Sequence, residues 1–484
     1  MDRGTALARR GRMDEAAALF EQAAAADAGL AEAHYNLGIA RRALGRGAEA
    51  EACWRRALAL KPEFAEARIN LGALLLERGE HAAAAAEFRL VLEREPRSVP
   101  ALVNLGNALR DGGDPQGAAE TYRRAVALQP GFAPALGNLG LALREAGDLA
   151  GAEAAYRRAL ELKPDYALAH RDLGILLLLA GRFAEGWREF AWRWKTRGLA
   201  RRDRGLPAWS GGGAPAKTVL IAAEQGLGDT IMFCRLAEAV AARGARAVLE
   251  VQPQLCRLLA GLKGAERIVA QGGAPPADRL GADCAAALMD LPGILGLNAG
   301  GIPARVPYLV PEAERVRRWR GWLEARPGLR IGVAWQGNPR SDAELGRSPP
   351  LAAFRPLAEI PGARLIALQK GPGSEQLASL PADMAVESPG EGFDSGPDAF
   401  LDTAALMQGL DLVVSADTAP AHLAGALARP VWIALKRVPD WRWGLDRDRT
   451  PWYPTARLFR QRASGDWARV FAAVADAARD LRRA

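Results

Sequence analysis

Five segments of this chain repeat at a constant spacing of 34 residues, and each of them ends in a Leu-Gly pair. The segments are Ala33–Gly38, Ala67–Gly72, Ala101–Gly106, Ala135–Gly140 and Ala169–Gly174. A fixed period of this length is typical of stacked helical hairpins, because each unit buries its apolar face only against its neighbours. We therefore expect residues 1–200 to form a helical superhelix and any catalytic chemistry to lie in the remaining chain.

Other positions repeat in the same register. A small residue of the second helix of each unit is followed four residues later by an aromatic one, in the pairs Ala50/Trp54, Ala84/Phe88, Ala118/Tyr122 and Ala152/Tyr156. A proline, which cannot continue a helix, then closes the unit at positions Pro62, Pro96, Pro130 and Pro164. This pattern resembles the tetratricopeptide repeat, which implies protein binding.

The two ends of the repeat array depart from the pattern. The first unit opens inside its first helix, so we expect either that this unit is truncated or that the chain is a fragment. The last unit, from Ala167, keeps Gly174 and Phe190 and then continues into Trp187, Trp192 and Trp194. These tryptophans indicate a capping unit that docks on the next domain.

An asparagine precedes the Leu-Gly pair in four units, and these residues are Asn36, Asn70, Asn104 and Asn138. A row of amides along one face of a superhelix can donate to and accept from successive peptide groups of an extended guest chain. The row is similar to the asparagine ladder of O-linked N-acetylglucosamine transferases, which implies a protein acceptor. The alternative is that these asparagines are bonded within their own hairpins or solvated.

Composition excludes several classes of function. The net charge is +8, but the basic residues are almost all arginines, 57 against 7 lysines, and acidic residues are interleaved with them. We therefore expect no nucleic-acid partner. The four cysteines form no CxxC pair, which argues against zinc and against disulfides and favours a reducing cytoplasm. We expect no metal, no signal peptide and no transmembrane segment, since the longest apolar run, 175–180, is far too short.

After a Gly- and Pro-rich linker at 201–217, in which Trp209 is expected to anchor the chain to a neighbour, strands alternate with helices. Such alternation predicts parallel sheets covered on both faces. We expect two Rossmann-like lobes, at 218–318 and 319–464, and a final helix at 465–484 that packs back on the lobes. The fold class is thus a helical solenoid followed by an α/β pair of lobes, with ligands bound outside the carboxyl ends of the strands.

Three loops follow strands and carry the polar residues. In the first, Gly226 and Gly228 let a ligand approach the backbone, and Asp229 is either a general base or a helix N-cap. The second begins at Gln336-Gly-Asn-Pro-Arg-Ser341, with Arg347 and Ser348 beyond it; Arg347 is either a phosphate clamp or a surface arginine.

The third loop is Asp417-Thr-Ala-Pro-Ala-His422, which opens a helix with small residues and suits a diphosphate. Asp417, Thr418, Ala419 and His422 are its candidate ligand-binding residues, with a buried structural role as the alternative for His422.

The first and third loops resemble the ADP-heptose:lipopolysaccharide heptosyltransferases, glycosyltransferase family 9, of the GT-B fold. The resemblance covers about residues 218–460 and implies an inverting, metal-independent transfer from a nucleotide-sugar. It implies that Asp229 is the base and that Thr418, Ala419 and His422, assisted by Arg347, hold the diphosphate. The family has Lys where this chain has Arg347 and Gly where it has Ala419, so the donor, an ADP or UDP sugar, is left open.

The fusion of repeats with a GT-B pair also looks like the O-linked N-acetylglucosamine transferases. We therefore expect a bacterial, cytoplasmic glycosyltransferase whose repeats recruit a protein acceptor. The alternative is a binding scaffold with a degenerate transferase domain. The aromatic segment Asp440–Tyr453 either closes over the nucleotide or wedges the last strand, Arg457–Gln461, against its lobe.

Overall fold

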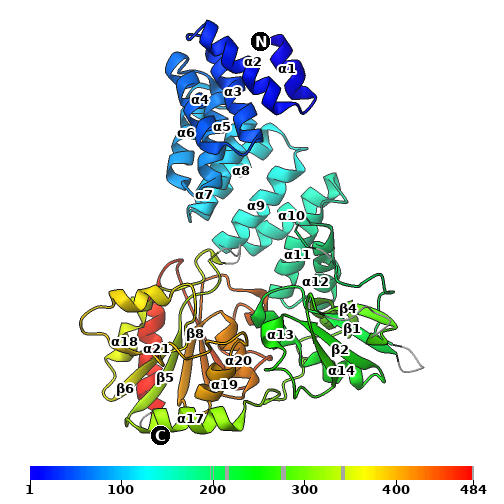
Figure 1. Ribbon diagram of the computed structural model, residues 1–484, viewed down its shortest axis with the longest axis vertical. Helices are drawn as coiled ribbons and strands as arrows, with labels where there is room; N and C mark the ends of the chain where they lie inside the picture. The colour runs from blue at the N-terminus through cyan, green and yellow to red at the C-terminus, as the bar shows by residue number, and fades with distance from the viewer. Residues whose placement is uncertain (197, 200, 213–216, 274–279, 340–343, 482–484) are drawn as a thin grey trace. The chain divides into compact units, whose positions relative to one another are not determined.

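The computed structural model describes residues 1–196, 198–199, 201–212, 217–273, 280–339 and 344–481. The chain divides into two compact units, Met1–Ala169 and His170–Ala484. The first is helical, and the second combines one further helical hairpin with two parallel sheets (Figure 1). The predicted fold class, a helical solenoid followed by an α/β region, is confirmed.

The first unit is a succession of antiparallel helical hairpins (Figure 1). Its helices are α1 (Asp2–Arg9), α2 (Met13–Ala26), α3 (Ala31–Ala43), α4 (Gly47–Leu60), α5 (Ala65–Glu77), α6 (His81–Arg94), α7 (Val99–Asp111), α8 (Pro115–Leu128), α9 (Ala133–Ala146) and α10 (Leu149–Leu162). Each proline that the sequence assigns to the end of a unit lies two residues beyond a second helix, as Pro62 does after α4.

A glycine in the left-handed region follows the first helix of each hairpin. Gly113, for example, has φ +88° and turns the chain from α7 into α8. A side chain is strained in this conformation, which is why glycine ends so many helices. The same position recurs every 34 residues, at Gly45, Gly79, Gly147 and Gly181.

The glycines of the Leu-Gly pairs have a different role, which is close packing inside the hairpin. A Cβ atom at Gly106 would lie 2.6 Å from the ring of Tyr122, and one at Gly140 would lie 2.6 Å from the ring of Tyr156. Both tyrosine side chains are fully buried. The paired glycine and aromatic thus set the distance between the two helices of a hairpin.

The last hairpin, α11 (Ala167–Leu179) with α12 (Phe183–Phe190) and the 3-10 helix η1 (Ala191–Lys195), belongs to the second unit from His170 on. The predicted boundary at residue 200 therefore differs from the observed division by one hairpin. The physical reason is that α12 packs on the α/β part: buried Arg193 of η1 forms ion pairs of 2.7 Å with both Glu224 and Asp290.

The first sheet is parallel and has the order β3-β2-β1-β4. Its strands are β1 (Thr218–Ala222), β2 (Arg246–Val251), β3 (Ala265–Ala270) and β4 (Cys284–Ala287). The segment before this sheet is fixed to it, because the Trp209 side chain is buried. The backbone N–H of Trp209 also donates to the carbonyl of Ala285 in β4 at 2.8 Å. The predicted anchoring role of Trp209 is confirmed.

The second sheet is parallel and has the order β10-β9-β8-β5-β6-β7. Its strands are β5 (Leu329–Ala334), β6 (Ala363–Ala367), β7 (Val386–Glu387), β8 (Leu412–Ala416), β9 (Val431–Leu435) and β10 (Ala456–Arg460). Helices α17 (Ala313–Glu324), α19 (Leu401–Met407) and α20 (Ala419–Ala426) lie on one side, and α18 (Arg355–Ala358) and α21 (Trp467–Leu481) on the other (Figure 1).

Several local expectations need correction. The helix expected at 231–242 is broken into α13 (Leu227–Phe233) and α14 (Leu236–Ala241), and the helix expected from Pro253 to Leu262 is only the 3-10 turn η2 (Pro253–Leu255). Helix α17 packs on α19, so the second lobe begins before the predicted residue 319. The main contacts of helix α21 in the described residues are with α18, β9 and β10 of this second lobe, although we expected it to pack back across both lobes.

The remaining elements are short. They are α16 (Leu291–Ile294) and the 3-10 turns η3 (Leu288–Asp290), η5 (Leu351–Phe354), η6 (Ser374–Ser379) and η7 (Trp441–Trp443). In the part of the chain that the structure describes, no helix has both the length and the apolar composition needed to cross a bilayer.

The contact of Gly106 with Tyr122 leads to a prediction about the repeats. We expect Gly106→Val to destabilise the helical unit by about 1–3 kcal/mol, because its side chain would overpack a filled site. Gly131→Val is the control, since a Cβ atom at Gly131 meets no atom within 4 Å, and it should change stability by at most about 0.5 kcal/mol. Thermal unfolding of the full chain, followed by far-UV circular dichroism, measures both; equal effects would contradict the packing role.

Candidate functional site

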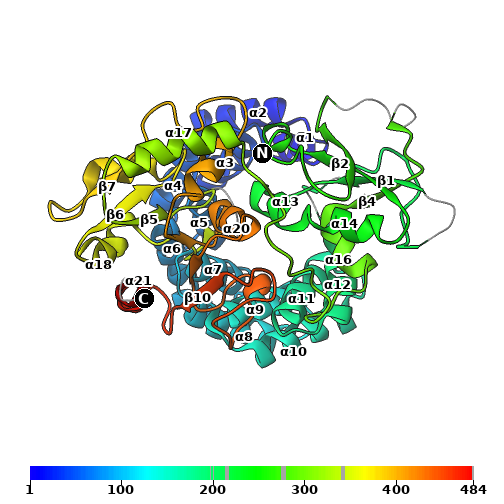
Figure 2. The same cartoon turned by 90° about the horizontal axis from the view of Figure 1, so that it is seen from below.

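Two helix starts, one from each lobe, meet at the centre of the second unit. Helices α13 and α20 lie side by side in both views (Figures 1 and 2). A Cβ atom at Gly228 would lie 3.0 Å from the ring of His422 and 3.3 Å from Cα of Ala419. The absence of a side chain at Gly228 therefore lets the loop after β1 approach the loop after β8. The structure thus brings the first and third predicted loops together.

Asp229 caps its helix, which is one of the two roles that the sequence left open, and its role as a general base stays a prediction. One carboxylate oxygen accepts a hydrogen bond of 3.0 Å from the N–H of Gly226, which caps α13. The other oxygen is ion-paired with Arg442 of the second lobe. The Asp229 side chain is 21% exposed, so a ligand in the adjoining space can reach its carboxylate.

Arg442 is the residue that sequence reasoning missed at this site. It lies in η7, is buried, and also pairs with Asp440 at 2.6 Å. Burial by itself would lower the pKa of Arg442, but the charges of Asp440 and Asp229 outweigh it and raise the pKa. The guanidinium is therefore a permanent cation between the two lobes. The sequence signal that could have pointed to Arg442 is the run Trp441-Arg442-Trp443, which directly follows Asp440.

The third loop is buried around the start of α20. Burial raises the pKa of Asp417 to about 6, and the charge of Asp440 adds to this effect, whereas Arg347 and Arg442 oppose it. The hydroxyl of Thr418 lies 3.1 Å from that of Ser415. At pH 7 this carboxyl is therefore still mostly ionised, and it lies beside a helix N-terminus, whose amides carry a partial positive charge.

His422 lies one turn into α20 and is enclosed by aromatic side chains. Its Nδ1 is 3.1 Å from the hydroxyl of Tyr453, and its ring is stacked on Trp443 with 5.4 Å between centroids. Burial holds the pKa of His422 well below its usual range, and the nearby positive charge of Arg442 adds to the effect. His422 is therefore a neutral, fixed imidazole whose Cδ2 edge faces Gly228.

The second predicted loop contributes Arg347 and Ser348. Arg347 pairs with Glu344 at 2.8 Å, and Ser348 accepts a hydrogen bond of 3.0 Å from the N–H of Gly337. The charge of Arg347 affects the pKa values of both Asp417 and His422, which places it beside the third loop. Residues 340 and 341 of this loop lie outside the described part of the chain.

The aromatic segment 440–453 is a wedge. The side chains of Trp441, Trp443, Trp452 and Tyr453 are all at most 4% exposed, so stacking on a nucleotide base is not their role. Trp452 packs edge-on against Phe233 of α13 at 5.5 Å, and its carbonyl accepts from buried Arg235 at 2.8 Å. The segment therefore contacts both lobes, and the expectation that it wedges the last strand, Arg457–Gln461, against its lobe stays a prediction.

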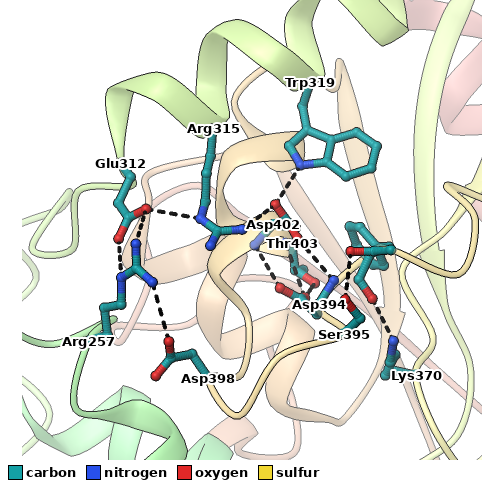
Figure 3. A network of polar contacts seen from close by, with 12 residues as sticks. Arg257, Glu312, Arg315, Trp319, Lys370, Asp394, Ser395, Asp398, Asp402 and Thr403 are labelled. Atoms are coloured by element: carbon teal, nitrogen blue, oxygen red, sulfur yellow. Dashed lines mark hydrogen bonds and ion pairs between the residues drawn. The ribbon is translucent and has the colours of Figure 1, made fainter.

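A second polar network joins the lobes (Figure 3). All of its residues precede the third loop in the sequence. Arg257 of the first lobe pairs with Glu312 at 2.6 Å and with Asp398 at 3.4 Å. Buried Asp402 then accepts from Arg315 at 2.7 Å and from Trp319 at 2.9 Å (Figure 3). Burial would raise the pKa of Asp402, but these bonds lower it, so the carboxylate remains charged and holds α17 on α19.

The asparagine row of the repeats is largely engaged within the first unit. The Nδ2 of Asn36 donates to the carbonyl of Glu32 at 2.9 Å, that of Asn70 to the hydroxyl of Tyr35 at 3.4 Å, and that of Asn138 to Asn107 at 3.3 Å. Asn104 lies at the equivalent place on α7 and is partly buried. Binding of a protein acceptor by these residues stays a prediction.

The comparisons with known families agree with this division of the chain. Models of the tetratricopeptide repeat match residues 1–22 and, in four overlapping stretches, 35–100, 89–134, 103–167 and 138–190. The model of glycosyltransferase family 9 (heptosyltransferase) matches residues 396–436, which contain α19, β8, α20 and β9. The chain carries tetratricopeptide repeats and a family 9 segment. That segment includes the whole third loop.

A curated relative is protein FlbA of Caulobacter vibrioides, which is 32% identical over 325 residues, or 62% of this chain and 53% of that protein. The chain thus spans about half the length of this relative. Two solved structures are similar to part of the chain. MamA of Desulfovibrio magneticus RS-1 is 24% identical, with a TM-score of 0.33, over 34% of this chain and 93% of that one. PilF of Pseudomonas aeruginosa is 19% identical, with a TM-score of 0.36, over 40% and 88%.

The pKa of Glu224 leads to a prediction about stability. Burial raises this pKa from the ordinary 4.5 to about 7, although Arg193 opposes the shift. Between pH 4.5 and 7 the folded protein therefore binds more protons at this site than the unfolded chain, and the stability that Glu224 contributes falls as pH rises through this window.

Glu224→Gln removes this titration, so the wild type should lose on the order of 3 kcal/mol relative to the variant between pH 5 and pH 8. Urea unfolding followed by tryptophan fluorescence measures the difference at each pH, since twelve of the thirteen tryptophans lie in the second unit. A difference that is the same at both pH values would contradict the assignment.

Proposed function

We propose that this chain is a metal-independent glycosyltransferase that moves a sugar from a nucleoside diphosphate sugar to a hydroxyl group of a protein. The observation that carries the proposal is the meeting of the loops around Asp229 and Thr418 at Gly228, with Arg442 between the lobes. Both loops follow the carboxyl ends of parallel strands, which is where α/β proteins bind ligands. The family 9 segment at 396–436 supports the same reading.

The start of α20 is the proposed diphosphate site. Pro420 has no N–H and the N–H of Ala421 donates to the carbonyl of Thr418 at 3.0 Å, so the start of α20 offers an anion the N–H of Ala419 and the positive end of the helix dipole. Thr418 adds a hydroxyl, and Arg347 and Arg442 add positive charge. Ala419 and Arg347 stand where the family typically has Gly and Lys. Because of these two differences, the proposal leaves the donor open between an ADP sugar and a UDP sugar.

Asp229 is the proposed general base. Its carboxylate takes the proton of the acceptor hydroxyl while the oxygen attacks the anomeric carbon of the sugar. The bond from that carbon to the diphosphate oxygen breaks, and the nucleoside diphosphate leaves with the electron pair, so the configuration is inverted. The helix N-terminus and the arginines stabilise the charge that develops on the leaving group.

Arg442 has one partner in the unliganded site and would have another in the liganded site. It pairs with Asp229 when no anion is present, and a bound diphosphate offers a competing partner close by. Transfer of the guanidinium to the diphosphate would release the Asp229 carboxylate for proton abstraction. Donor binding would in this way prepare the base.

The repeats are the proposed recruiting surface, because proteins of this architecture bind other proteins on their superhelical faces. The reaction is placed in the reducing cytoplasm, which the free cysteines fit. If ADP, UDP and GDP all fail to bind, the chain is instead a scaffold whose transferase lobes are inactive.

Nucleotide binding tests the diphosphate site. We expect ADP or UDP at a hundredfold excess over its dissociation constant to stabilise the second unit by about 2.7 kcal/mol. Ala419→Glu should abolish this gain, because a carboxylate would then occupy the helix N-terminus. Ala352→Glu is the control on an exposed position of the same lobe and should keep it. Tryptophan-detected thermal unfolding measures all of them; equal stabilisation in both variants would contradict the site.

Turnover tests the base. Asp229→Asn keeps the side-chain oxygen that accepts from Gly226, so α13 should remain capped. We expect kcat to fall by about 10²–10⁴ while the affinity for the nucleoside diphosphate changes by less than about threefold. Calorimetry and transfer assays measure the two quantities. A parallel loss of both would remove Asp229 from the role of base.

A further inference from the structure

The start of α20 offers an anion fewer amide donors than most helix starts do. The first N–H groups of an ordinary helix have no partner inside the helix, and these groups bind anions. Here Pro420 has no N–H and the N–H of Ala421 donates to the carbonyl of Thr418 at 3.0 Å, so Ala419 is left to supply its amide. A diphosphate has several oxygen atoms that accept hydrogen bonds. The site therefore needs further donors from side chains.

The imidazole of His422 lies at this helix start with one nitrogen unused. A Cβ atom at Gly228 would lie 3.0 Å from Cδ2 of His422 and 3.5 Å from the backbone nitrogen of Ala419, so the ring edge and the amide border the same small space. Nε2 adjoins Cδ2 in the ring and makes no hydrogen bond with the described residues. The fully buried polar atoms without a partner include Nε of Arg442 but not Nε2 of His422, which therefore keeps access to solvent.

The other nitrogen of this ring is held by a tyrosine from a distant segment. Nδ1 of His422 lies 3.1 Å from the hydroxyl of Tyr453, which follows it by 31 residues. Tyr453 is fully buried, and a side chain at Gly425 of α20 would collide with its ring, so the tyrosine is closely packed on the helix. Burial keeps the pKa of His422 low and the ring neutral, so the imidazole carries one proton, on either Nδ1 or Nε2. The direction of the bond to Tyr453 decides which of the two it is.

The surroundings of Tyr453 favour the tyrosine as the donor. Burial raises the pKa of Tyr453, although the charge of Arg235 opposes the shift, so the phenol keeps its proton. The guanidinium of Arg235 lies 4.7 Å from the centroid of the Tyr453 ring, and a guanidinium has no lone pair that could accept this proton. The hydroxyl of Tyr308 already accepts from Arg235 and donates to the carbonyl of Ile231, both at 2.9 Å. Nδ1 of His422 is the partner that the described residues give the Tyr453 hydroxyl.

We propose that Tyr453 is a positioning residue for the diphosphate site: its hydroxyl donates to Nδ1 of His422 and so fixes the imidazole in the tautomer that carries its proton on Nε2. The Nε2–H then supplies a neutral donor beside the amide of Ala419 and compensates for the N–H that Pro420 lacks. In the other tautomer a lone pair on Nε2 would face the anion and repel it. This inference rests on the proposed function, for which it assigns a donor and the residue that orients this donor.

The tautomer can be measured in the full chain without any ligand. We expect nitrogen NMR of protein with isotope-labelled histidine to show a protonated Nε2 and an unprotonated Nδ1 for His422, whose signals are identified by their loss in His422→Gln. In Tyr453→Phe, which removes only the hydroxyl, the proton should be shared between the two nitrogens. A wild-type spectrum with the proton on Nδ1 would overturn the proposal, and so would a spectrum that Tyr453→Phe leaves unchanged.

Affinity for ADP and UDP, measured by calorimetry, tests the consequence for binding. We expect Tyr453→Phe to weaken the binding of whichever nucleotide the wild type binds by about three- to tenfold, as the loss of one neutral hydrogen bond would. Tyr308→Phe is the matched control, because it also removes a hydroxyl that contacts the Arg235 side chain but not one that contacts His422, and it should change affinity by less than about twofold.

A double-mutant cycle shows whether Tyr453 acts through the imidazole. In the His422→Ala background, Tyr453→Phe should have no further effect on nucleotide affinity, because the group that it orients is gone. An effect of Tyr453→Phe that persists in this background would overturn the positioning role. Equal losses of affinity in Tyr453→Phe and Tyr308→Phe would overturn it as well.

The tautomer is measured without a nucleotide, so the two proposals can fail separately. A protein whose His422 carries a Tyr453-dependent Nε2 proton but which binds neither ADP nor UDP would refute the proposed function and the diphosphate as acceptor, while the fixing of the tautomer by Tyr453 would stand. Equal nucleotide affinity in wild type and Tyr453→Phe would refute the positioning role alone.

Discussion

The close approach of α13 and α20 is the contact on which the site depends. Each lobe alone presents only the ends of its own strands, and neither contains both a candidate base and a candidate diphosphate site. Gly228 permits the approach because it has no side chain between the two helices. Buried Arg235 and the aromatic wedge around Trp452 hold the lobes at this distance, through hydrogen bonds to backbone carbonyls and through ring contacts. The lobes are thus joined by buried polar and aromatic contacts, which break at a higher cost than exposed ion pairs.

Charge is concentrated at the same place. Arg442 is buried between partly exposed carboxylates of both lobes, so its charge interacts with them more strongly than it would at the surface. The burial that raises the pKa of Asp417 also keeps His422 neutral. A site prepared in this way favours an incoming anion, because Arg442 remains charged whether or not its carboxylate partners are.

Much of the fold could be predicted from local pattern. The repeat period, the prolines after each second helix and the runs of apolar residues in β1, β5, β8 and β9 all depend on residues close in sequence, and the structure has them where they were expected. The errors occurred where local pattern and tertiary packing disagree. The apolar segment at 231–242 is broken between α13 and α14, where Arg235 turns inward to bind carbonyls of distant segments. The last hairpin has the sequence pattern of the solenoid, yet an ion pair between Arg193 and Glu224 attaches it to the α/β part.

The sequence by itself determined the helical repeats, the order of strands and helices, and the loops that carry Asp229 and Thr418, because glycine, proline and alternating apolar residues act over a few positions. Only the tertiary structure decided which of these loops meet and that Arg442 lies against Asp229 across 213 residues of chain. These features depend on contacts between residues far apart in sequence, each of which has an ordinary local context. Their energies arise from burial and charge, which are properties of the folded arrangement.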